Sequence, residues 1–398
     1  TILEHIAHVT KIPIATIREI NFIKEDEAKA GKKLPNGCEM SDFTIPKLFK
    51  QISNNVNEEE LAKSVADFNN NNRWKKRGLA KTPVRYEVNV YARSSLVNIY
   101  ADGSIIVHHG TSDIGQGANV KVIQAVAQRL GQLFNPCRPL DLSLIRCAEL
   151  DTTVLPNCTF TGGSTSSESS CEAAQDACDA ILARIKPILT GIAQEKQEKG
   201  EDVSSITWES ICAEAAGKSI NLSAVGYCNG ARAYQNFGGC LSVVELDVLT
   251  GEIEILESHL LYDCGKSLNP AVDIGQAEGA FVMGLGFLLR EEVSFDEEGR
   301  LVNDGTWEYK PPCFRDIPQV FNVELLHDTP FEKGYLSSKA SGEPPLVLAN
   351  SVGFAIRQAI RAARIENGMD DEFFVLDTPL TVDVIQQACG SPTLDLSQ

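Results

Sequence analysis

The sequence predicts an α+β fold in which strands and helices follow one another without a regular repeat. Strands are indicated by alternating apolar and polar residues, as in YEVNVYA at 86–92. Helices are indicated by apolar residues at helical spacing, as in the long run at 167–189. Hydrophobic residues make up 43% of the chain and charged residues 23%, so a chain of 398 residues can bury a sizeable core.

The first part of the chain is predicted to be helical at its start and irregular afterwards. Residues 2–22 fit an amphipathic helix followed by a capped second one. The next stretch carries charge and asparagine, including NNVNEEE and FNNNNRWKKRG, which fits a solvated connection around a short helix. We therefore place a boundary near residue 75, between units at 1–75 and 76–398. No initiator Met or signal peptide precedes the first helix, so we expect the chain to begin inside a larger protein.

The second part is predicted to interleave strands with helices. A sheet begins near Tyr86, and ADGS at 101–104 supplies a hairpin turn between two strands. LTGE at 249–252 turns a second hairpin. An exposed, charged linker is predicted at 195–205. The predicted helices follow the glycines of GQG at 115–117 and occupy 167–189, 269–292 and 346–365.

The acidic balance of the chain disfavours two classes of partner. Lys and Arg number 36 against 54 Asp and Glu, a net charge of −18, which repels phosphate backbones and anionic lipid heads. The apolar run GAFVMGLGFLL at 279–289 is shorter than the roughly 20 residues that cross a bilayer. We therefore expect no nucleic-acid partner, no membrane partner and no transmembrane helix.

The cysteines and histidines do not suggest a metal site. The 12 cysteines include no CxxC pair, and reduced thiols in a cytoplasmic protein explain them better than disulfides. The 6 histidines are scattered, apart from the adjacent His108 and His109, so no zinc-type cluster can be assembled locally. A metal in this protein would have to be held mostly by something other than side chains.

Three short segments carry the candidate chemistry: GTSDIGQGANV at 110–120, TGGSTSSES at 161–169 and KASGEPPLVLANS at 339–351. The first two place small residues just before a helix, where free N–H groups and the helix dipole favour a phosphate or a polar heterocycle. Neither is a Walker loop, because no GK[ST] follows. Together with Gln116 they indicate either a large polar ligand or a pair of ordinary helix starts.

Glu343 is the strongest candidate for acid–base chemistry. It stands between Gly342 and two prolines, which supply no backbone donors, and an apolar helix follows. We expect a stiff, water-poor loop, in which a carboxylate can act as a general base. The alternative is an ordinary helix N-terminal acid stabilised by the dipole.

The order of four segments resembles, almost residue by residue, the last part of the molybdenum hydroxylases, the xanthine dehydrogenase and aldehyde oxidase family. These are GTSDIGQG, DTTVLPNCTFTGGSTSSES, YDCGKSLNPAVDIGQAEGAFVMGLGFLLREE and LSSKASGEPPLVLANSVGFAIRQAIRAAR. The resemblance runs from the first helix to about residue 390. It implies the C-terminal portion of the molybdenum-cofactor domain, with 1–75 closing a first molybdopterin-binding subdomain and 76–398 forming a second.

The resemblance also implies roles for particular residues. In that family the dithiolene of a pterin chelates the molybdenum, which accounts for the missing Cys/His cluster. Glu343 matches the base that takes a proton so that an oxygen derived from water can attack the substrate. Gly163 would lie against the molybdenum. The cofactor contacts implied are Gly115, Gln116, Gly163, Ser164, Thr165, Ser166 and Gln276.

Departures from the family pattern bear on the substrate. Val90 stands where xanthine-oxidising members place a phenylalanine that stacks on the purine. Gly162 and Gly163 stand where alanines are common, which leaves more room beside the ion. TFTGGSTSSESSCEA is more similar to plant-type aldehyde oxidases. The resemblance therefore implies oxidation of aldehydes to carboxylic acids, or of N-heterocycles, with Val90 in the substrate pocket.

The resemblance leaves several alternatives open. A xanthine dehydrogenase or oxidase acting on purines is one, and a catalytically silent structural homologue is another. A phosphate-binding module is disfavoured by the net charge and by the apparent lack of Lys or Arg near either loop. FAD and two 2Fe–2S clusters are expected in further domains of a cytoplasmic, homodimeric full-length protein. Whether NAD or oxygen accepts the electrons stays open.

Overall fold

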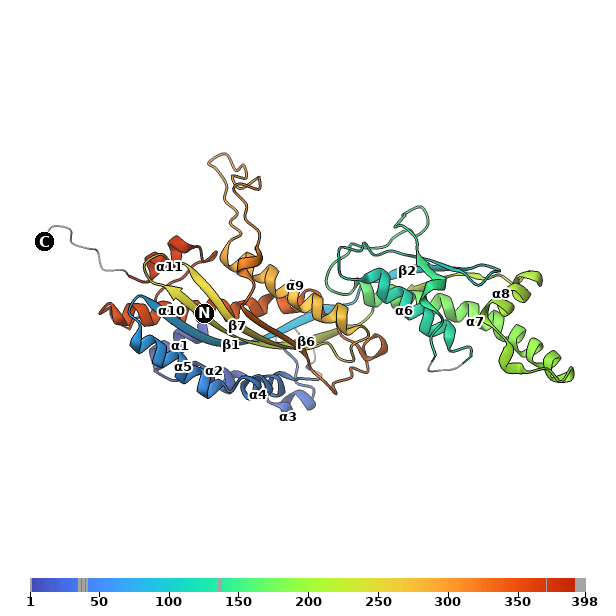
Figure 1. The fold of residues 1–398 in the computed structure, drawn as a ribbon, viewed down its shortest axis with the longest axis horizontal. Coiled ribbons are helices and arrows are strands. Elements are labelled where there is room, and N and C mark those ends of the chain that lie inside the picture. Colours follow the sequence, from blue (N-terminus) through green and yellow to red (C-terminus); the bar gives the residue numbers. More distant parts are fainter. Residues whose placement is uncertain are drawn as a thin grey trace.

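Figure 1 shows the computed structural model, which describes residues 2–34, 37, 40, 42–134, 138–369 and 371–390. Two lobes lie side by side, each with its own sheet (Figure 1). The larger lobe contains a four-stranded sheet in the order β1-β6-β7-β8, and the smaller lobe one in the order β4-β3-β2-β5. The predicted α+β class is confirmed.

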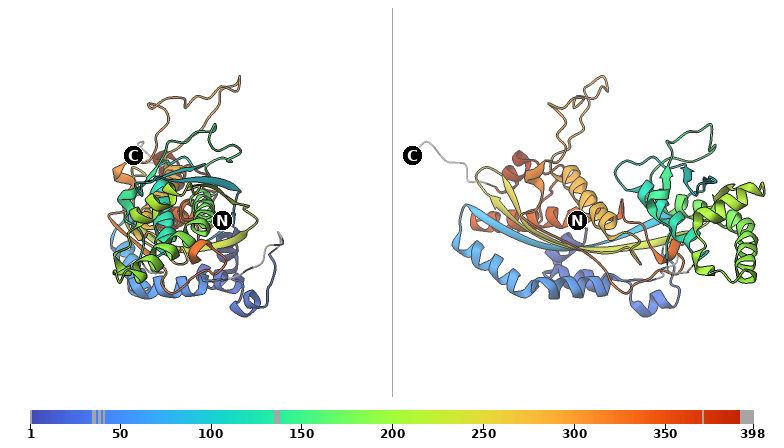
Figure 2. Two further views of the ribbon diagram at one scale, coloured as in Figure 1. Left: turned by 90° about the vertical axis from the view of Figure 1, so that its right-hand side faces the viewer. Right: turned by 45° about the vertical axis from the view of Figure 1, so that its right-hand side comes forward.

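The larger sheet is built on two long antiparallel strands. β1 (Lys75–Asn89) pairs with β6 (Ala233–Asp247), and β6 pairs with β7 (Ile253–Asp263). β8 (Val320–Leu325) lies parallel to β7 at the edge. Figure 2 (right) shows β1 and β6 running from the larger lobe toward the smaller one. They are the direct link between the lobes.

Helices cover both faces of this sheet. α9 (Pro270–Leu289) and α10 (Asn350–Glu366) pack on one face and share a buried cluster with β6 and β7. α4 (Ile45–Val56) packs on the opposite face, over β6 and β7, while α5 (Glu58–Asn71) lies against β1. The remaining helices of this lobe are α1 (Ile2–Thr10), α2 (Ile14–Asn21), α3 (Glu25–Lys29) and α11 (Val382–Ala388).

The smaller lobe is an insertion between β1 and β6. Its sheet consists of β2 (Arg93–Ile99), β3 (Ile105–His109), β4 (Ile145–Cys147) and β5 (Ser223–Cys228). Its helices are α6 (Ala118–Gly131), α7 (Ser166–Glu198) and α8 (Trp208–Gly217). Because the chain leaves the larger sheet at β1 and returns at β6, the lobe's loops are brought beside the start of α9. Short 3-10 helices occur at Leu142–Leu144, Val203–Ser205, Phe314–Asp316, Tyr335–Ser337 and Pro344–Ala349.

Most of the expected elements are present, and three expectations are wrong. The larger sheet begins at Lys75, with β1, and not near Tyr86. Both hairpins and the helices after GQG and in 167–189, 269–292 and 346–365 are confirmed. The stretch after residue 22 is not a solvated connection, because Ile45, Leu48 and Ile52 form an apolar stripe that packs on the sheet. The linker at 195–205 begins inside α7, which continues to Glu198. The division at residue 75 stays a prediction, although β1 begins there.

α9 is the one helix in the described parts of the chain that is long and apolar enough, by those two criteria alone, to cross a membrane. The apolar run at 279–289, which we judged too short to cross a bilayer, is only the second half of this 20-residue helix. Half of its apolar window is buried, and Ala277, Phe281 and Leu285 belong to the core of the larger lobe. Core helices of globular domains pass the same test, so the feature is weak evidence for a span.

Candidate cofactor and active site

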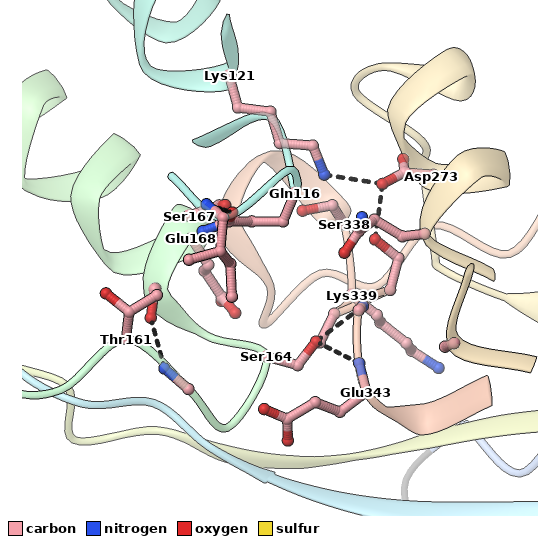
Figure 3. Close-up of a pocket in the computed structure, with 18 of the residues that line it drawn as sticks. Gln116, Lys121, Thr161, Ser164, Ser167, Glu168, Asp273, Ser338, Lys339 and Glu343 are labelled. Carbon is pink, nitrogen blue, oxygen red and sulfur yellow. Dashed lines mark hydrogen bonds and ion pairs between the residues drawn. The ribbon is translucent and has the colours of Figure 1, made fainter. Parts of the chain in front are cut away.

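A pocket of about 480 Å³ lies where the two lobes meet. The smaller lobe contributes the loop before α6 and the start of α7, and the larger lobe contributes the start of α9 and the loop at 335–346. Figure 3 shows side chains from these four segments converging on one space. The pocket-lining residues with polar side chains are Gln116, Lys121, Thr161, Ser164, Ser166, Ser167, Glu168, Asp273, Gln276, Tyr335, Ser338, Lys339, Ser341 and Glu343. Cys171 also lines the pocket.

Hydrogen bonds made by the Gln116 side chain fix the conformation of the loop before α6. The Gln116 side chain donates to the carbonyl of Ser112 (2.8 Å) and accepts from the N–H of Ile114 (2.6 Å). The N–H of Ser112 donates to Thr161 Oγ1 (3.0 Å), which ties this loop to the one before α7. Gln116 lines the pocket, so its contact with a cofactor stays a prediction, whereas the exposed Gly115 serves the turn through a φ of 102°.

Two serine hydroxyls at the start of α7 are oriented by the donors around them. Ser164 Oγ accepts from the N–H groups of Gly342 (2.8 Å) and Glu343 (3.2 Å). Ser166 Oγ accepts from Arg93 Nη2 (2.9 Å) and the N–H of Gly162 (3.2 Å). Each hydroxyl oxygen thus accepts two hydrogen bonds, so its own O–H is free to donate to a ligand. Both serines line the pocket.

Thr165 and Gly163 complete this helix start in different ways. Thr165 is fully buried, and its Oγ1 has no hydrogen-bond partner among the described residues. Gly163 has a φ of +71°, and an added Cβ there would lie 3.1 Å from the Tyr91 ring. Its N–H points at the carboxylate of Glu343. A residue with a side chain would strain this turn and crowd the ring.

The start of α9 forms a charged corner of the pocket. Asp273 is 3% exposed and accepts from Lys121 Nζ (2.8 Å), Ser341 Oγ (2.8 Å) and Ser267 Oγ (2.6 Å). Gln276, one turn along, lines the pocket and its side chain makes no hydrogen bond within the described parts of the chain. Gln276 is therefore available to a ligand. Lys121 corrects our expectation that no cation lies near the helix-start loops.

The loop before Glu343 is fastened to the larger sheet. The carbonyl of Ala340 accepts from Asn236 Nδ2 and the Tyr262 hydroxyl, both fully buried. Lys339, although also in the loop, turns its ammonium away from the pocket to pair with the buried Asp263 at 2.9 Å. These bonds fix the backbone from which Glu343 projects.

Glu343 lies at the edge of the pocket, where both of its oxygens are hydrogen bonded. Oε1 accepts from the N–H of Gly163 (2.7 Å), and Oε2 accepts from the Tyr86 hydroxyl (2.5 Å). The prolines that follow are buried, which confirms the stiff loop. The water-poor setting is wrong, however, because the Glu343 side chain is exposed. Its orientation comes from donors on two other segments rather than from desolvation.

Val90 is not part of the pocket wall. It is 7% exposed and belongs to a buried cluster with Val88, Tyr234 and Phe331. Its N–H donates to the carbonyl of Arg232, which keeps the side chain turned inward. The assignment of Val90 to the substrate pocket is therefore wrong.

Besides Tyr86, two aromatic rings lie close to the Glu343 carboxylate: Phe160 beside Gly162 and Tyr91 beside Gly163. Their ring centroids are 5.2 Å apart at an angle of 58°. Added Cβ atoms on Gly162 and Gly163 would touch Phe160 and Tyr91 respectively. Both rings are exposed, so they can contact a ligand that approaches Glu343.

Arg93 was missed by the sequence analysis because its partners are distant in the chain. It is 1% exposed and donates to the carbonyls of Gly110 and Phe160 and to Ser166. One guanidinium therefore joins both helix-start loops. Within the described residues no carboxylate pairs with it, and burial lowers the pKa of Arg93 from its usual value.

Cysteine and histidine do not form a metal centre in the part of the chain that the structure describes. No group of three or more His, Cys, Asp or Glu side chains there could hold an ion. Ten cysteines are free, most of them buried, while Cys38 and Cys137 lie outside the described residues.

The comparisons with known proteins show the family of this chain. A family described as molybdopterin cofactor-binding domain matches residues 51–318, more than half of the chain. The chain belongs to this family. The resemblance found in the sequence is confirmed, and so is the fold that it implied.

Relatives of this molybdopterin-binding chain include plant aldehyde oxidases. Probable aldehyde oxidase 3 of Oryza sativa subsp. japonica is 41% identical over 98% of the chain and 28% of its own length. An indole-3-acetaldehyde oxidase of Zea mays is 41% identical, and the abscisic-aldehyde oxidase of Arabidopsis thaliana 40%, each over 98% of the chain and 29% of the relative. The molybdopterin-binding chain thus spans less than a third of these relatives.

Solved structures share the fold of the molybdopterin-binding chain. Quinoline 2-oxidoreductase from Pseudomonas putida 86 matches with a TM-score of 0.81 at 18% identity, over 98% of this chain and 51% of that one. Reconstituted CO dehydrogenase from Oligotropha carboxidovorans matches with a TM-score of 0.79 at 19% identity, over 97% and 50%. At such identities the likeness shows the fold alone.

The residues that line this pocket fit a large organic cofactor rich in acceptor atoms. The oriented hydroxyls of Ser164 and Ser166 and the amide of Gln276 supply donors from both lobes, whereas the buried Thr165 hydroxyl does not line the pocket. Lys121 adds a cation at one end. Donors of this kind suit a pterin with its phosphate, which would hold the molybdenum without protein thiolates.

Proposed function

We propose that this chain supplies the cofactor pocket and the general base of an oxidoreductase that converts aldehydes to carboxylic acids. The observation that carries the proposal is the Glu343 carboxylate at the pocket edge, held by Gly163 and Tyr86. In the net reaction an aldehyde and water give a carboxylic acid, two electrons and two protons. When bound, the molybdenum cofactor would supply a Lewis acid and the acceptor for the two electrons.

Glu343 is proposed to take one of these protons. A general base has to lie within hydrogen-bond reach of the oxygen that it deprotonates. Each Glu343 oxygen accepts one hydrogen bond from the protein, so each keeps a lone pair for a proton arriving from the pocket. The exposed side chain can then release the proton to water.

Aldehydes are proposed as the substrate class because the relatives named above are aldehyde oxidases. Tyr91 and Phe160 support planar members of this class. Their rings form an exposed aromatic corner beside Glu343, and offset aromatic contacts contribute roughly 0.5–1.5 kcal/mol beyond area burial. Such a corner would also accept a flat N-heterocycle, so purine oxidation is the competing outcome.

The rest of the enzyme is proposed from the resemblance. FAD and two 2Fe–2S clusters in further domains would carry the electrons away, and the full-length protein would be a cytoplasmic homodimer without nucleic-acid or membrane partners. The net charge of −18 supports the absence of polyanionic partners.

The test is Glu343→Gln in the full-length enzyme. The amide keeps the shape of the side chain but cannot take the proton, so we expect folding and molybdenum content near wild type and turnover lowered by about 10² to 10⁴-fold. Glu278→Gln is the matched control, since Glu278 is an exposed acid on α9 that does not line the pocket. A Glu343→Gln enzyme with near wild-type kcat would refute the proposal, as would cofactor-loaded wild type that does not oxidise aldehydes.

A further inference from the structure

Tyr86 makes a contact that neither the motifs nor the comparisons assign. This tyrosine is half-buried in β1, and its hydroxyl donates to Glu343 Oε2 at 2.5 Å. We propose that Tyr86 is a positioning residue, whose hydroxyl holds the Glu343 carboxylate in place and aligned toward the pocket. The inference rests on the proposed role of Glu343 as base.

The two partners are fixed by the same pair of strands. Tyr86 stands directly opposite Asn236 in the β1–β6 register. Asn236 in turn donates to the carbonyl of Ala340 and to the Tyr262 hydroxyl. The donor thus sits on β1, while the loop that carries Glu343 is fastened to β6 at the matching position. The distance between Tyr86 and Glu343 is therefore set by sheet register, not by flexible side chains alone.

Tyr86 remains a donor throughout the range in which an enzyme works. Burial, and then the neighbouring Glu343 carboxylate, raise the pKa of Tyr86 well above its usual range. The other donor to Glu343, the N–H of Gly163, has no titration in water. Two permanent donors, one on each oxygen, fix the plane of the carboxylate and leave lone pairs toward the pocket.

Loss of the Tyr86 hydroxyl has a predictable effect. Without it, one Glu343 oxygen loses the donor that fixes the carboxylate plane, while the rest of the pocket keeps its contacts. A misaligned base slows proton transfer more than it weakens substrate binding. We therefore expect kcat to fall by about tenfold and KM to stay near wild type.

The experiment compares Tyr86→Phe with wild type in the full-length holoenzyme. The kcat per bound molybdenum should fall by about tenfold, while KM for an aldehyde stays near wild type. Tyr100→Phe is the matched control: Tyr100 is an exposed tyrosine that does not line the pocket, and its hydroxyl makes no hydrogen bond in the described residues, so both values should stay unchanged.

A singly fluorinated tyrosine at position 86 separates positioning from packing. It keeps the ring and the hydroxyl, so kcat per bound molybdenum should stay near wild type. A fluorinated enzyme that loses as much kcat as Tyr86→Phe, or a Tyr86→Phe enzyme with wild-type kcat per bound molybdenum, would overturn the inference. If Glu343→Gln abolishes turnover while Tyr86→Phe keeps wild-type kcat, only the role of Tyr86 fails. If Glu343→Gln remains active, the proposed function fails with it.

Discussion

Ser164→Ala tests whether one hydroxyl joins the cofactor loop to the catalytic loop. Ser164 Oγ accepts from the N–H groups of Gly342 and Glu343 at 2.8 and 3.2 Å. Gly342 is partly buried, so its N–H would lose a partner at a cost of about 1–3 kcal/mol, whereas the N–H of the exposed Glu343 can turn to water. We therefore expect local destabilisation of about 1–3 kcal/mol in residues 340–346, not twice that amount.

Hydrogen exchange of the full-length enzyme measures this loss directly. A penalty of 1–3 kcal/mol should speed exchange of the 340–346 backbone by about 5- to 150-fold, and kcat/KM should fall by about tenfold because the base is no longer held. Ser167→Ala is the matched control: Ser167 also lines the pocket at the start of α7, but its side chain makes no hydrogen bond in the described residues. Equal exchange in Ser164→Ala and Ser167→Ala would refute the coupling between the two loops.

Two further predictions concern the cofactor and the substrate. Gln116→Ala removes the amide that bridges Ser112 and Ile114, so the loop should lose its shape and molybdenum stoichiometry should fall; unchanged metal and pterin content would show that this loop does not bind the cofactor. The full-length enzyme should have a higher kcat/KM for an aromatic aldehyde than for xanthine, and Tyr91→Ala should lower the value for aromatic aldehydes more than for aliphatic ones. A preference for xanthine, or an equal loss for both aldehyde classes, would contradict this interpretation.

Local sequence signals were sufficient for the loops that begin helices. Small residues before apolar, helix-forming runs predict free N–H groups at α6 and α7, and both helices begin within two residues of the glycine or serine expected. Glu343 could be selected for a similar reason, since the two prolines after it define a stiff turn. These features depend on neighbours in the chain, so a single sequence reveals them.

The sequence pattern does not reveal the start of β1, because some of the side chains that face the interior from this strand are polar. Lys76, Ala80, Thr82 and Val84 all face the interior, but only some are apolar, so the period-two pattern is hidden until Tyr86. Lys76 tolerates burial because its ammonium donates to two carbonyls at the end of α5. The compensation comes from the C-terminal end of α5, where the sequence showed only an exposed asparagine-rich run.

Val90 lies next to the site in the sequence, but its side chain packs in the core and not against the pocket as expected. β1 ends at Asn89, yet the N–H of Val90 still donates to Arg232, so the inward face continues for one more residue and Val90 joins the core. The next residue, Tyr91, faces the opposite way and meets Gly163. Side chains alternate along a strand, so the neighbours Val90 and Tyr91 face opposite ways: Val90 packs in the core and Tyr91 faces Gly163. Which residue faces the edge of the pocket therefore depends on where the pairing of β1 with β6 ends, and a single sequence does not show that partner.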